Sequence, residues 1–161
     1  MGSSWRNLST PIGWIQLEAS EGFLTKLDFL GEEPKDKGHS IDDPKDEEIL
    51  EKTANQLDQY FQKKIQRFDL PLNPQGTIFQ QRIWKILQQI PYGHTWTYKE
   101  LAVAYGDVLA IRAVGKANGA NPIPIIIPCH RVIGANGHLI GYSGGLERKI
   151  ALLTLEGSTL F

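Results

Sequence analysis

The stretch Ile127-Pro128-Cys129-His130-Arg131-Val132 contains the only cysteine of the 161 residues and places a histidine directly beside it. A single thiol cannot form an internal disulfide, nor can it supply the thiolate cluster of a structural zinc or iron–sulfur site. Two roles remain for Cys129, packing as a small buried hydrophobe or acting as a reactive thiol. The residues around it decide between these roles.

The residues before the cysteine predict a buried setting for it. Residues 123–128 are the most apolar run of the chain, and they contain two prolines. We expect this run to form an extended strand that holds Cys129 at its exit. Adjacent residues of an extended backbone point to opposite sides, so His130 is expected to reach the thiol through a water molecule or a local turn.

A histidine that acts as a base needs an orienting partner, which is usually a carboxylate. The second half of the chain offers four acidic residues: Glu100, Asp107, Glu147 and Glu156. Glu156 stands at the end of the last predicted helix and is the candidate. The alternative, an exposed terminal glutamate without a role, stays open at this point.

The composition, 41% hydrophobic and 22% charged, is typical of a folded protein with one sizeable domain or two small ones. No apolar run approaches the ~20 residues that span a bilayer, so we expect no membrane segment. The first residues lack the basic region and apolar core of a secretory signal. We therefore expect a cytoplasmic, reducing location, which suits a free thiol.

Charge divides unevenly along the chain. Residues 1–76 carry nine Lys and Arg against fourteen Asp and Glu, whereas residues 77–161 carry eight against four. Phosphate neutralisation dominates affinity for nucleic acids, so the basic half, which also holds the cysteine, is consistent with a nucleic-acid partner. A chance distribution of solvated charge would give the same pattern.

The first 70 residues predict a small α+β unit. Residues 10–19 and 23–30 alternate apolar and polar side chains as strands do, with a hairpin loop at 20–22. Residues 32–44 show no apolar periodicity and are expected to be a mobile connection. Residues 46–64 follow with an amphipathic helical pattern.

After an extended linker at 68–74, the pattern becomes mostly helical. We expect a helix at 79–90 capped by Thr77, a short extended piece at 95–97, two short helices around the turn at Gly106, and a last helix at 148–155. The two short helices, 98–104 and 109–118, have the element order of a helix-turn-helix, although a generic helical hairpin fits this order as well.

Several motifs follow one another in a fixed order. They are Arg112-Ala113-Val114-Gly115, Asn121-Pro122, Pro128-Cys129-His130-Arg131-Val132, Tyr142-Ser143-Gly144-Gly145 and Glu156-Gly157. In this order they resemble the O6-alkylguanine-DNA alkyltransferases, also called methylated-DNA–protein-cysteine methyltransferases, over about residues 77–157. The first 70 residues resemble that family only in their strand-strand-helix order. The resemblance implies an α+β protein, with a small ribonuclease-H-like domain at 1–70 and a mostly helical, winged-helix-like, DNA-binding and alkyl-acceptor domain at 71–161.

The resemblance also implies a reaction. Cys129 would accept the alkyl group from O6 of a damaged guanine, or from O4 of thymine, irreversibly and once per molecule. His130 would take the thiol proton through a water, Glu156 would orient the imidazole, and Tyr98 would donate to guanine N3. No cofactor is implied. No metal is expected either, because the first unit lacks the cysteines with which some relatives bind zinc.

Further residues match the family's binding positions. By this resemblance the backbone around Ser143, next to Tyr142, would donate to O6, while the carbonyls of Cys129 and Val132 would accept from the exocyclic amine. Lys149 would lie near the site. Asn121 would brace the recognition helix against the cysteine-bearing strand, or else serve only as a turn residue before Pro122.

The implied partner is double-stranded DNA, bound by a monomer through the minor groove. Arg112 would fill the gap left by the flipped nucleotide, and Ala113 and Gly115 would permit close approach of the helix backbone. The pattern does not fix Ile111 and Asn118, which leaves lesion preference open.

Two other functions remain possible from sequence. A lesion flag would bind damaged DNA and recruit other proteins without chemistry, but known flagging relatives replace the cysteine that this chain retains. A Cys-His hydrolase would need an oxyanion hole, for which the sequence offers no donor pair, and it would leave Arg112 and Tyr98 unexplained.

Overall fold

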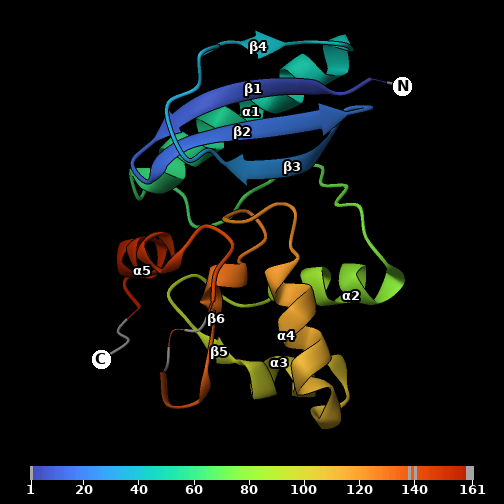
Figure 1. Cartoon of the computed structure of the whole chain (residues 1–161), viewed down its shortest axis with the longest axis vertical. Coiled ribbons are helices and arrows are strands. Elements are labelled where there is room, and N and C mark those ends of the chain that lie inside the picture. Colours follow the sequence, from blue (N-terminus) through green and yellow to red (C-terminus); the bar gives the residue numbers. More distant parts are fainter. Residues whose placement is uncertain (1, 138, 140, 159–161) are drawn as a thin grey trace. The chain divides into compact units, whose positions relative to one another are not determined.

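The computed structural model describes residues 2–137, 139 and 141–158, arranged as two compact units, Met1–Gln75 and Gly76–Phe161 (Figure 1). The first unit is a four-stranded antiparallel sheet with one helix. Its elements are β1 (Ser4–Thr10), β2 (Gly13–Ser20), β3 (Phe23–Phe29), β4 (His39–Ser40) and α1 (Pro44–Phe61), with the strand order β3-β2-β1-β4. Figure 1 shows α1 lying along one face of this sheet.

The core of the first unit lies between the sheet and α1. Alternate residues of β2, among them Ile15 and Leu17, are fully buried, and α1 contributes Leu50, Leu57 and Tyr60. Burial of these apolar side chains stabilises the unit. The helix predicted at 46–64 is confirmed, but it ends earlier, at Phe61, and begins earlier, because Asp43 caps it and Pro44 suits the first turn.

Strand β1 was not predicted, because buried positions on both of its faces are polar. Ser4 and Asn7 are buried, and each has polar partners: Ser4 Oγ donates to Asp46 Oδ2 at 2.8 Å, and Asn7 Nδ2 donates to the Asp36 carbonyl at 2.7 Å. Hydrogen bonds thus replace the apolar alternation that marks a strand in sequence. The segment 32–44, predicted to lack regular structure, contains β4 and the first residue of α1, so that prediction was wrong there.

The linker after α1 forms backbone hydrogen bonds with the first unit. The Leu24 amide donates to the Pro71 carbonyl at 2.8 Å, and the Asn73 amide donates to the Leu24 carbonyl at 2.8 Å. Leu24 and Leu72 form an isolated parallel bridge. These bonds explain why the first unit extends to Gln75.

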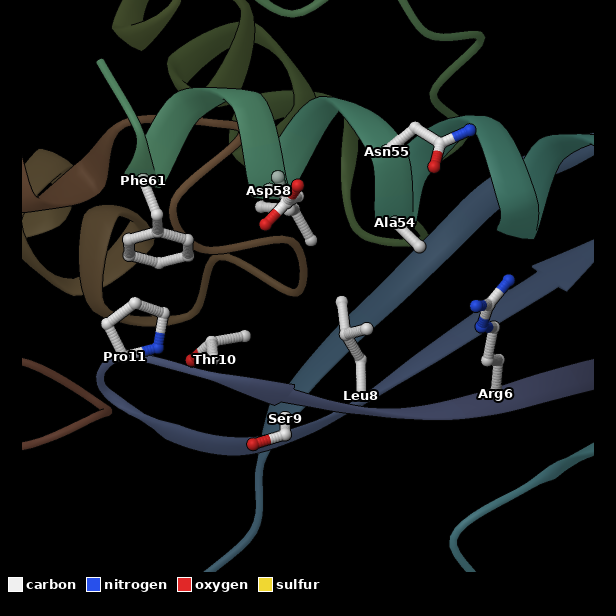
Figure 2. Close-up of a pocket in the computed structure, with 10 residues that line it drawn as sticks. Arg6, Leu8, Ser9, Thr10, Pro11, Ala54, Asn55, Asp58 and Phe61 are labelled. Atoms are coloured by element: carbon white, nitrogen blue, oxygen red, sulfur yellow. The ribbon is translucent and has the colours of Figure 1, made fainter. Parts of the chain in front are cut away.

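A pocket of about 210 Å³ opens between β1 and α1 (Figure 2). Leu8 and Arg6 point from β1 toward α1, whose Ala54 and Asn55 line the other side, and Phe61 closes one end. None of the residues expected to carry chemistry belongs to the first unit.

The second unit is mostly helical. Its helices and strands are α2 (Ile78–Leu87), β5 (Trp96–Thr97), α3 (Tyr98–Tyr105), η1 (Val108–Ala110), α4 (Ile111–Gly119), η2 (Cys129–Arg131), β6 (Val132–Ile133), η3 (Ala135–Gly137) and α5 (Leu146–Leu155). Strands β5 and β6 pair in parallel. The core gathers Ile83, Leu87, Leu101 and Val114, and the Trp84 indole donates to the Ala117 carbonyl at 2.8 Å.

The starts of α2 and α3 agree with the prediction because their caps are explicit in the sequence, whereas α5 begins at Leu146 rather than at residue 148. Thr77 with Gln80, and Thr97 with Glu100, form reciprocal capping boxes at the starts of α2 and α3. Gly106 ends α3 in the left-handed conformation, at φ 104°. The predicted helix at 109–118 is divided: a 3₁₀ turn, η1, precedes α4.

The strand predicted at 123–128 is wrong. The segment is buried, as expected, but it forms a turn, in which the Ile127 amide donates to the Ile123 carbonyl at 3.0 Å and Ile125 adopts φ 73°. The two prolines have no amide proton for a strand ladder, and the Asn121 side chain binds backbone groups of this turn instead. Cys129 therefore begins the 3₁₀ turn η2 rather than ending a strand.

No helix in the described ranges is both long enough and apolar enough to cross a membrane.

Candidate active site

Cys129 lies almost fully buried at the start of η2, with 3% of its surface exposed. Burial raises the pKa of its thiol to about 11, although a hydrogen bond with Asn121 and the charge of Lys149 act in the opposite direction. At neutral pH the thiol therefore keeps its proton. Because the thiolate is the nucleophilic form, a reaction at Cys129 needs a base.

His130, the next residue, binds a carboxylate. Its Nε2 lies 2.8 Å from Glu156 Oε2, and neither side chain is exposed. A carboxylate only accepts hydrogen bonds, so Nε2 carries the proton and Nδ1 keeps its lone pair. His130 Nδ1 is buried and has no hydrogen-bond partner within the described part of the chain. This nitrogen is free to accept a proton.

Arg131 holds the carboxylate of Glu156. Its Nε and Nη2 donate to Glu156 Oε1 at 2.8 Å and to Glu156 Oε2 at 3.0 Å, and Nη1 donates to the Ile90 carbonyl at 2.7 Å. The guanidinium carbon also lies 5.7 Å from the centre of the Tyr92 ring. Two parallel bonds to one carboxylate fix both its charge and its orientation.

The ionisation of this cluster follows from these contacts. Burial by itself raises the pKa of Glu156, but hydrogen bonds from His130 and Arg131 and their positive charges outweigh it and bring the pKa down to about 2. Burial lowers the pKa of His130, and Glu156 opposes this only in part. The cluster at neutral pH is a neutral histidine held by an ionised glutamate.

Lys149 is buried rather than on the surface, with no exposed area. Its Nζ donates to the Val132 carbonyl at 2.7 Å. Burial lowers the pKa of Lys149 to about 8, while interaction with Cys129 raises it. Lys149 thus fixes the Val132 carbonyl and places a titratable amine close to the thiol.

Cys129 also affects the pKa values of two tyrosines. Tyr98, the first residue of α3, has its pKa raised by burial and by Cys129, and lowered by a hydrogen bond with Asn118. Its ring rests on α4, because a Cβ at Gly115 would lie 3.4 Å from Tyr98 Cδ1. Burial, and then Cys129, raise the pKa of Tyr142 well above its ordinary value.

The asparagines of this region bind backbone carbonyls. Asn121 Nδ2 donates to the Ile127 carbonyl at 2.8 Å, and its Oδ1 accepts from the Ile123 amide at 3.0 Å. The residue that follows α4 therefore holds the cysteine-bearing segment in place. Asn118, a residue without a predicted role, donates from Nδ2 to the Cys129 carbonyl at 3.4 Å.

The residues expected to touch DNA lie on the outer face of α4. Arg112 and Ala113 are exposed, and Gly115 is half-buried. Within the described ranges no hydrogen bond or ion pair is formed by the Arg112 side chain. Ser143 is exposed as well, on the loop before α5.

The described residues contain no group of three or more His, Cys, Asp or Glu that could hold a metal ion.

Comparison with known proteins connects both units to one family. The model of the 6-O-methylguanine DNA methyltransferase DNA-binding domain matches residues 78–158, and the ribonuclease-like domain of the same family matches residues 4–74. The fold class predicted from sequence, a small ribonuclease-like unit followed by a helical DNA-binding unit, is thereby confirmed.

Relatives match along nearly the whole chain. A methylated-DNA–protein-cysteine methyltransferase of Methanosarcina barkeri is 49% identical over 158 residues, which is 95% of this chain and 96% of the relative. The Mycobacterium bovis protein of the same name is 47% identical over 156 residues, 96% of this chain and 92% of the relative.

Solved structures agree with these relatives. The crystal structure of Mycobacterium tuberculosis OGT in complex with DNA has a TM-score of 0.82 and 47% identity, and covers 94% of this chain and 92% of that one. An O6-methylguanine-DNA methyltransferase from Pyrococcus kodakaraensis, at 22% identity and a TM-score of 0.57, shares the fold. The chain belongs to the 6-O-methylguanine DNA methyltransferase family, whose activity is DNA repair by transfer of a methyl group to a cysteine of the protein itself.

Proposed function

We propose that Cys129 accepts the alkyl group and that each molecule reacts once. The family's activity requires an acceptor cysteine in the protein, and this chain has one cysteine. That observation carries the assignment. Its setting agrees with it, because Cys129 is followed by a buried histidine whose free nitrogen can take a proton.

Proton transfer starts the reaction. His130 Nδ1 takes the thiol proton through a bridging water, and Glu156 and Arg131 stabilise the imidazolium that forms. The thiolate Sγ then attacks the alkyl carbon, an S–C bond forms, and the C–O6 bond breaks. The electron pair of that bond stays on the guanine, which takes up one proton in exchange for the proton lost by the thiol. No group in the site can cleave the resulting thioether, so the transfer is irreversible.

Base recognition uses the same segment. The Cys129 and Val132 carbonyls accept from the exocyclic amine of the guanine, and Lys149 keeps the Val132 carbonyl in place. The Tyr98 hydroxyl donates to N3, which stabilises the departing guanine. The backbone at Ser143, with Tyr142 beside it, donates to O6 and completes the selection of an O6-alkylguanine; O4-alkylthymine is the second candidate base.

The substrate is duplex DNA, met through the minor groove. The target nucleotide rotates out at an unstacking cost of a few kcal/mol. Arg112 enters the gap, while Ala113 and Gly115 let α4 approach the groove closely. The chain acts as a monomer, without a cofactor, inside the cell where its substrate lies.

We expect Arg112→Ala to impair repair of duplex DNA selectively. Without the side chain that fills the gap, the flipped state loses about 1 to 3 kcal/mol, so the transfer rate on a duplex with O6-methylguanine falls roughly tenfold to a hundredfold. On a single strand, which has no stack to restore, the rate changes by less than about threefold. Quenched-flow measurements give the transfer rates on the duplex and on the single strand.

Lys116→Ala is the matched control, because Lys116 is exposed on the same helix and also carries a positive charge. A general loss of phosphate attraction would lower both variants equally on both substrates. Equal losses, or an unimpaired duplex rate in Arg112→Ala, would contradict the role given to Arg112.

Stoichiometry tests the proposed function itself. Protein titrated against an excess of lesion duplex is expected to repair one lesion per molecule, and a second addition of DNA is expected to give no further repair. Repair of many lesions per molecule would refute irreversible transfer to Cys129.

A further inference from the structure

Apolar side chains gather on the surface where α3 passes through η1 into α4. Leu109, in η1, is 91% exposed, and Val103, near the end of α3, is 59% exposed. Val108 and Ile111 are exposed as well. A single apolar side chain on a surface needs no explanation, but these four lie close together in the chain and form an accessible patch, here called the turn patch.

The backbone of the turn patch is fixed by hydrogen bonds. Gly106 ends α3 in the left-handed conformation, and the Asp107 amide donates to the Ala102 carbonyl at 3.1 Å. The Asp107 carboxylate accepts from the Leu109 amide at 2.9 Å, and the Asp107 carbonyl accepts from the Ala110 amide at 3.0 Å. Leu109 is therefore presented on an ordered turn, which lowers the entropic cost of binding a partner.

Leu109 lies on the same side of the chain as Arg112. Side chains three positions apart lie one above the other in a 3₁₀ turn, and they are neighbours on an α-helix as well. The turn η1 continues directly into α4, since Ile111 already has the helical φ of −53° and ψ of −45°. Leu109 and Arg112 are three positions apart, and both are exposed. The apolar side chain thus neighbours the cation that would enter the minor groove.

The position of the turn patch favours DNA as its partner. The patch continues the exposed face of α4, within the unit that matches the family's DNA-binding domain. When a nucleotide rotates out of a duplex, the bases beside the gap expose apolar ring faces. Leucine is one of the side chains that proteins of the minor groove insert between base steps.

The charges around the turn patch also suit DNA. Lys99, Arg112 and Lys116 are exposed on α3 and α4, where they can attract phosphates. The two acidic residues of this segment bind backbone amides as helix caps: Glu100 accepts from the Thr97 amide at 3.0 Å, and Asp107 accepts from the Leu109 amide.

We propose that Leu109 is an apolar wedge, which enters the minor groove beside Arg112 and packs against the base step that flanks the flipped nucleotide. The inference rests on the proposed function, because it requires a duplex from which a nucleotide has rotated out. Arg112 fills the gap itself, whereas Leu109 covers the exposed ring faces beside it. The two side chains together oppose the return of the nucleotide to the stack.

Leu109→Ala tests the wedge, with Ile78→Ala as the matched control. Each change removes the same number of carbon atoms from an exposed side chain, and Ile78, in α2, is 75% exposed. At low protein concentration we expect Leu109→Ala to react with an O6-methylguanine duplex roughly tenfold more slowly, because the apolar contact is lost. On a single strand of the same sequence its rate should change by less than about twofold. Ile78→Ala should stay within about twofold on both substrates.

The salt dependence of binding separates an apolar wedge from a phosphate contact. Binding to the lesion duplex is measured by fluorescence anisotropy in the Cys129→Ala background, so that no transfer consumes the complex. A side chain that neutralises a phosphate contributes about 0.9 to the slope of log affinity against log salt, whereas leucine releases no counterion. We therefore expect Leu109→Ala to weaken binding by the same factor at every salt concentration.

Unstacking is measured with 2-aminopurine, whose fluorescence is quenched in a stack, placed on either side of the lesion in separate duplexes. At saturating protein, in the same Cys129→Ala background, we expect fluorescence to rise on at least one side. Leu109→Ala should reduce this rise to less than about half, and Ile78→Ala should leave it unchanged.

Several results would overturn the wedge: a duplex rate for Leu109→Ala equal to that of Ile78→Ala, equal losses on duplex and single strand, a changed salt slope, or an undiminished rise in fluorescence. A shift in the sedimentation of Leu109→Ala without DNA, with its transfer rate unchanged, would also overturn it and assign the turn patch to contacts between copies of the chain. Each of these leaves the proposed function intact while the unaltered protein still methylates Cys129. Absence of that reaction would overturn both.

Discussion

Cys129→Ala is expected to abolish alkyl transfer altogether, because the chain has no second thiol to take over the reaction. Alanine removes only the sulfur from a buried position, so we expect a modest loss of stability, on the order of 1 kcal/mol. Binding to a lesion-containing duplex should stay within about threefold of the unaltered protein, because the Arg112 and Tyr98 contacts remain.

Transfer is followed with a radiolabelled methyl group on the DNA, and binding is followed by fluorescence anisotropy. Cys129→Ser is the matched control, since it keeps the size and a hydroxyl but not a thiol that can ionise near neutral pH. Label on the protein of either variant, or removal of the lesion by the alanine variant, would contradict the role of Cys129.

Glu156→Gln is expected to lower both the stability of the protein and the rate of alkyl transfer. The carboxylate is fully buried and binds His130 and Arg131, so its loss leaves the Arg131 charge without its partner. Removing one member of a buried ion pair costs about 3 to 5 kcal/mol. We expect the free energy of unfolding, measured in urea at neutral pH, to fall by an amount near the lower end of this range, because glutamine keeps the shape of glutamate. Transfer should slow about a hundredfold, since the imidazolium is no longer stabilised.

The dependence of stability on pH distinguishes the contribution of the ion pair from that of simple packing. The folded-state pKa of Glu156, about 2, lies below the ordinary 4.5, so its stabilising effect is present above pH 4.5 and is lost as the pH falls toward 2. The pKa of His130 is lowered in the folded protein, so the folded state also loses stability as the pH falls below 6.5. The stability difference between the unaltered protein and Glu156→Gln should therefore shrink in acid.

Glu147→Gln is the control for this comparison, because Glu147 is exposed on the same helix, α5. It should leave stability within about 0.5 kcal/mol at every pH. A difference between the unaltered protein and Glu156→Gln that stays constant from neutral pH to about pH 3 would contradict the ionised state assigned to Glu156.

The helices were predictable because the signals that start and end them are local. The capping pairs that begin α2 and α3 and the glycine that ends α3 can be read from a few adjacent residues. Strand β1 could not be predicted, since its buried residues Ser4 and Asn7 are polar and are satisfied by residues that are distant in sequence. The turn at 123–128 also could not be predicted from apolar periodicity, because the Asn121 side chain binds its backbone groups.

The candidate site was predictable where the residues are reactive and not where they support others. Cys129, His130 and Glu156 have chemistry that sequence can suggest, and the structure brings His130 and Glu156 into contact. Arg131 binds the Glu156 carboxylate and Asn118 donates to the Cys129 carbonyl, and only the folded chain places them there. Lys149 shows the same limit: the resemblance placed it near the site, but only the folded chain shows that it is buried and bound to the Val132 carbonyl.

Mass spectrometry of the intact protein, after incubation with a duplex containing O6-methylguanine, tests the central claim most directly. We predict a gain of one methyl group per molecule, located on Cys129 by peptide mapping, with unmodified guanine left in the DNA. An unchanged protein mass with the lesion still bound, or a methyl group on any other residue, would contradict the claim.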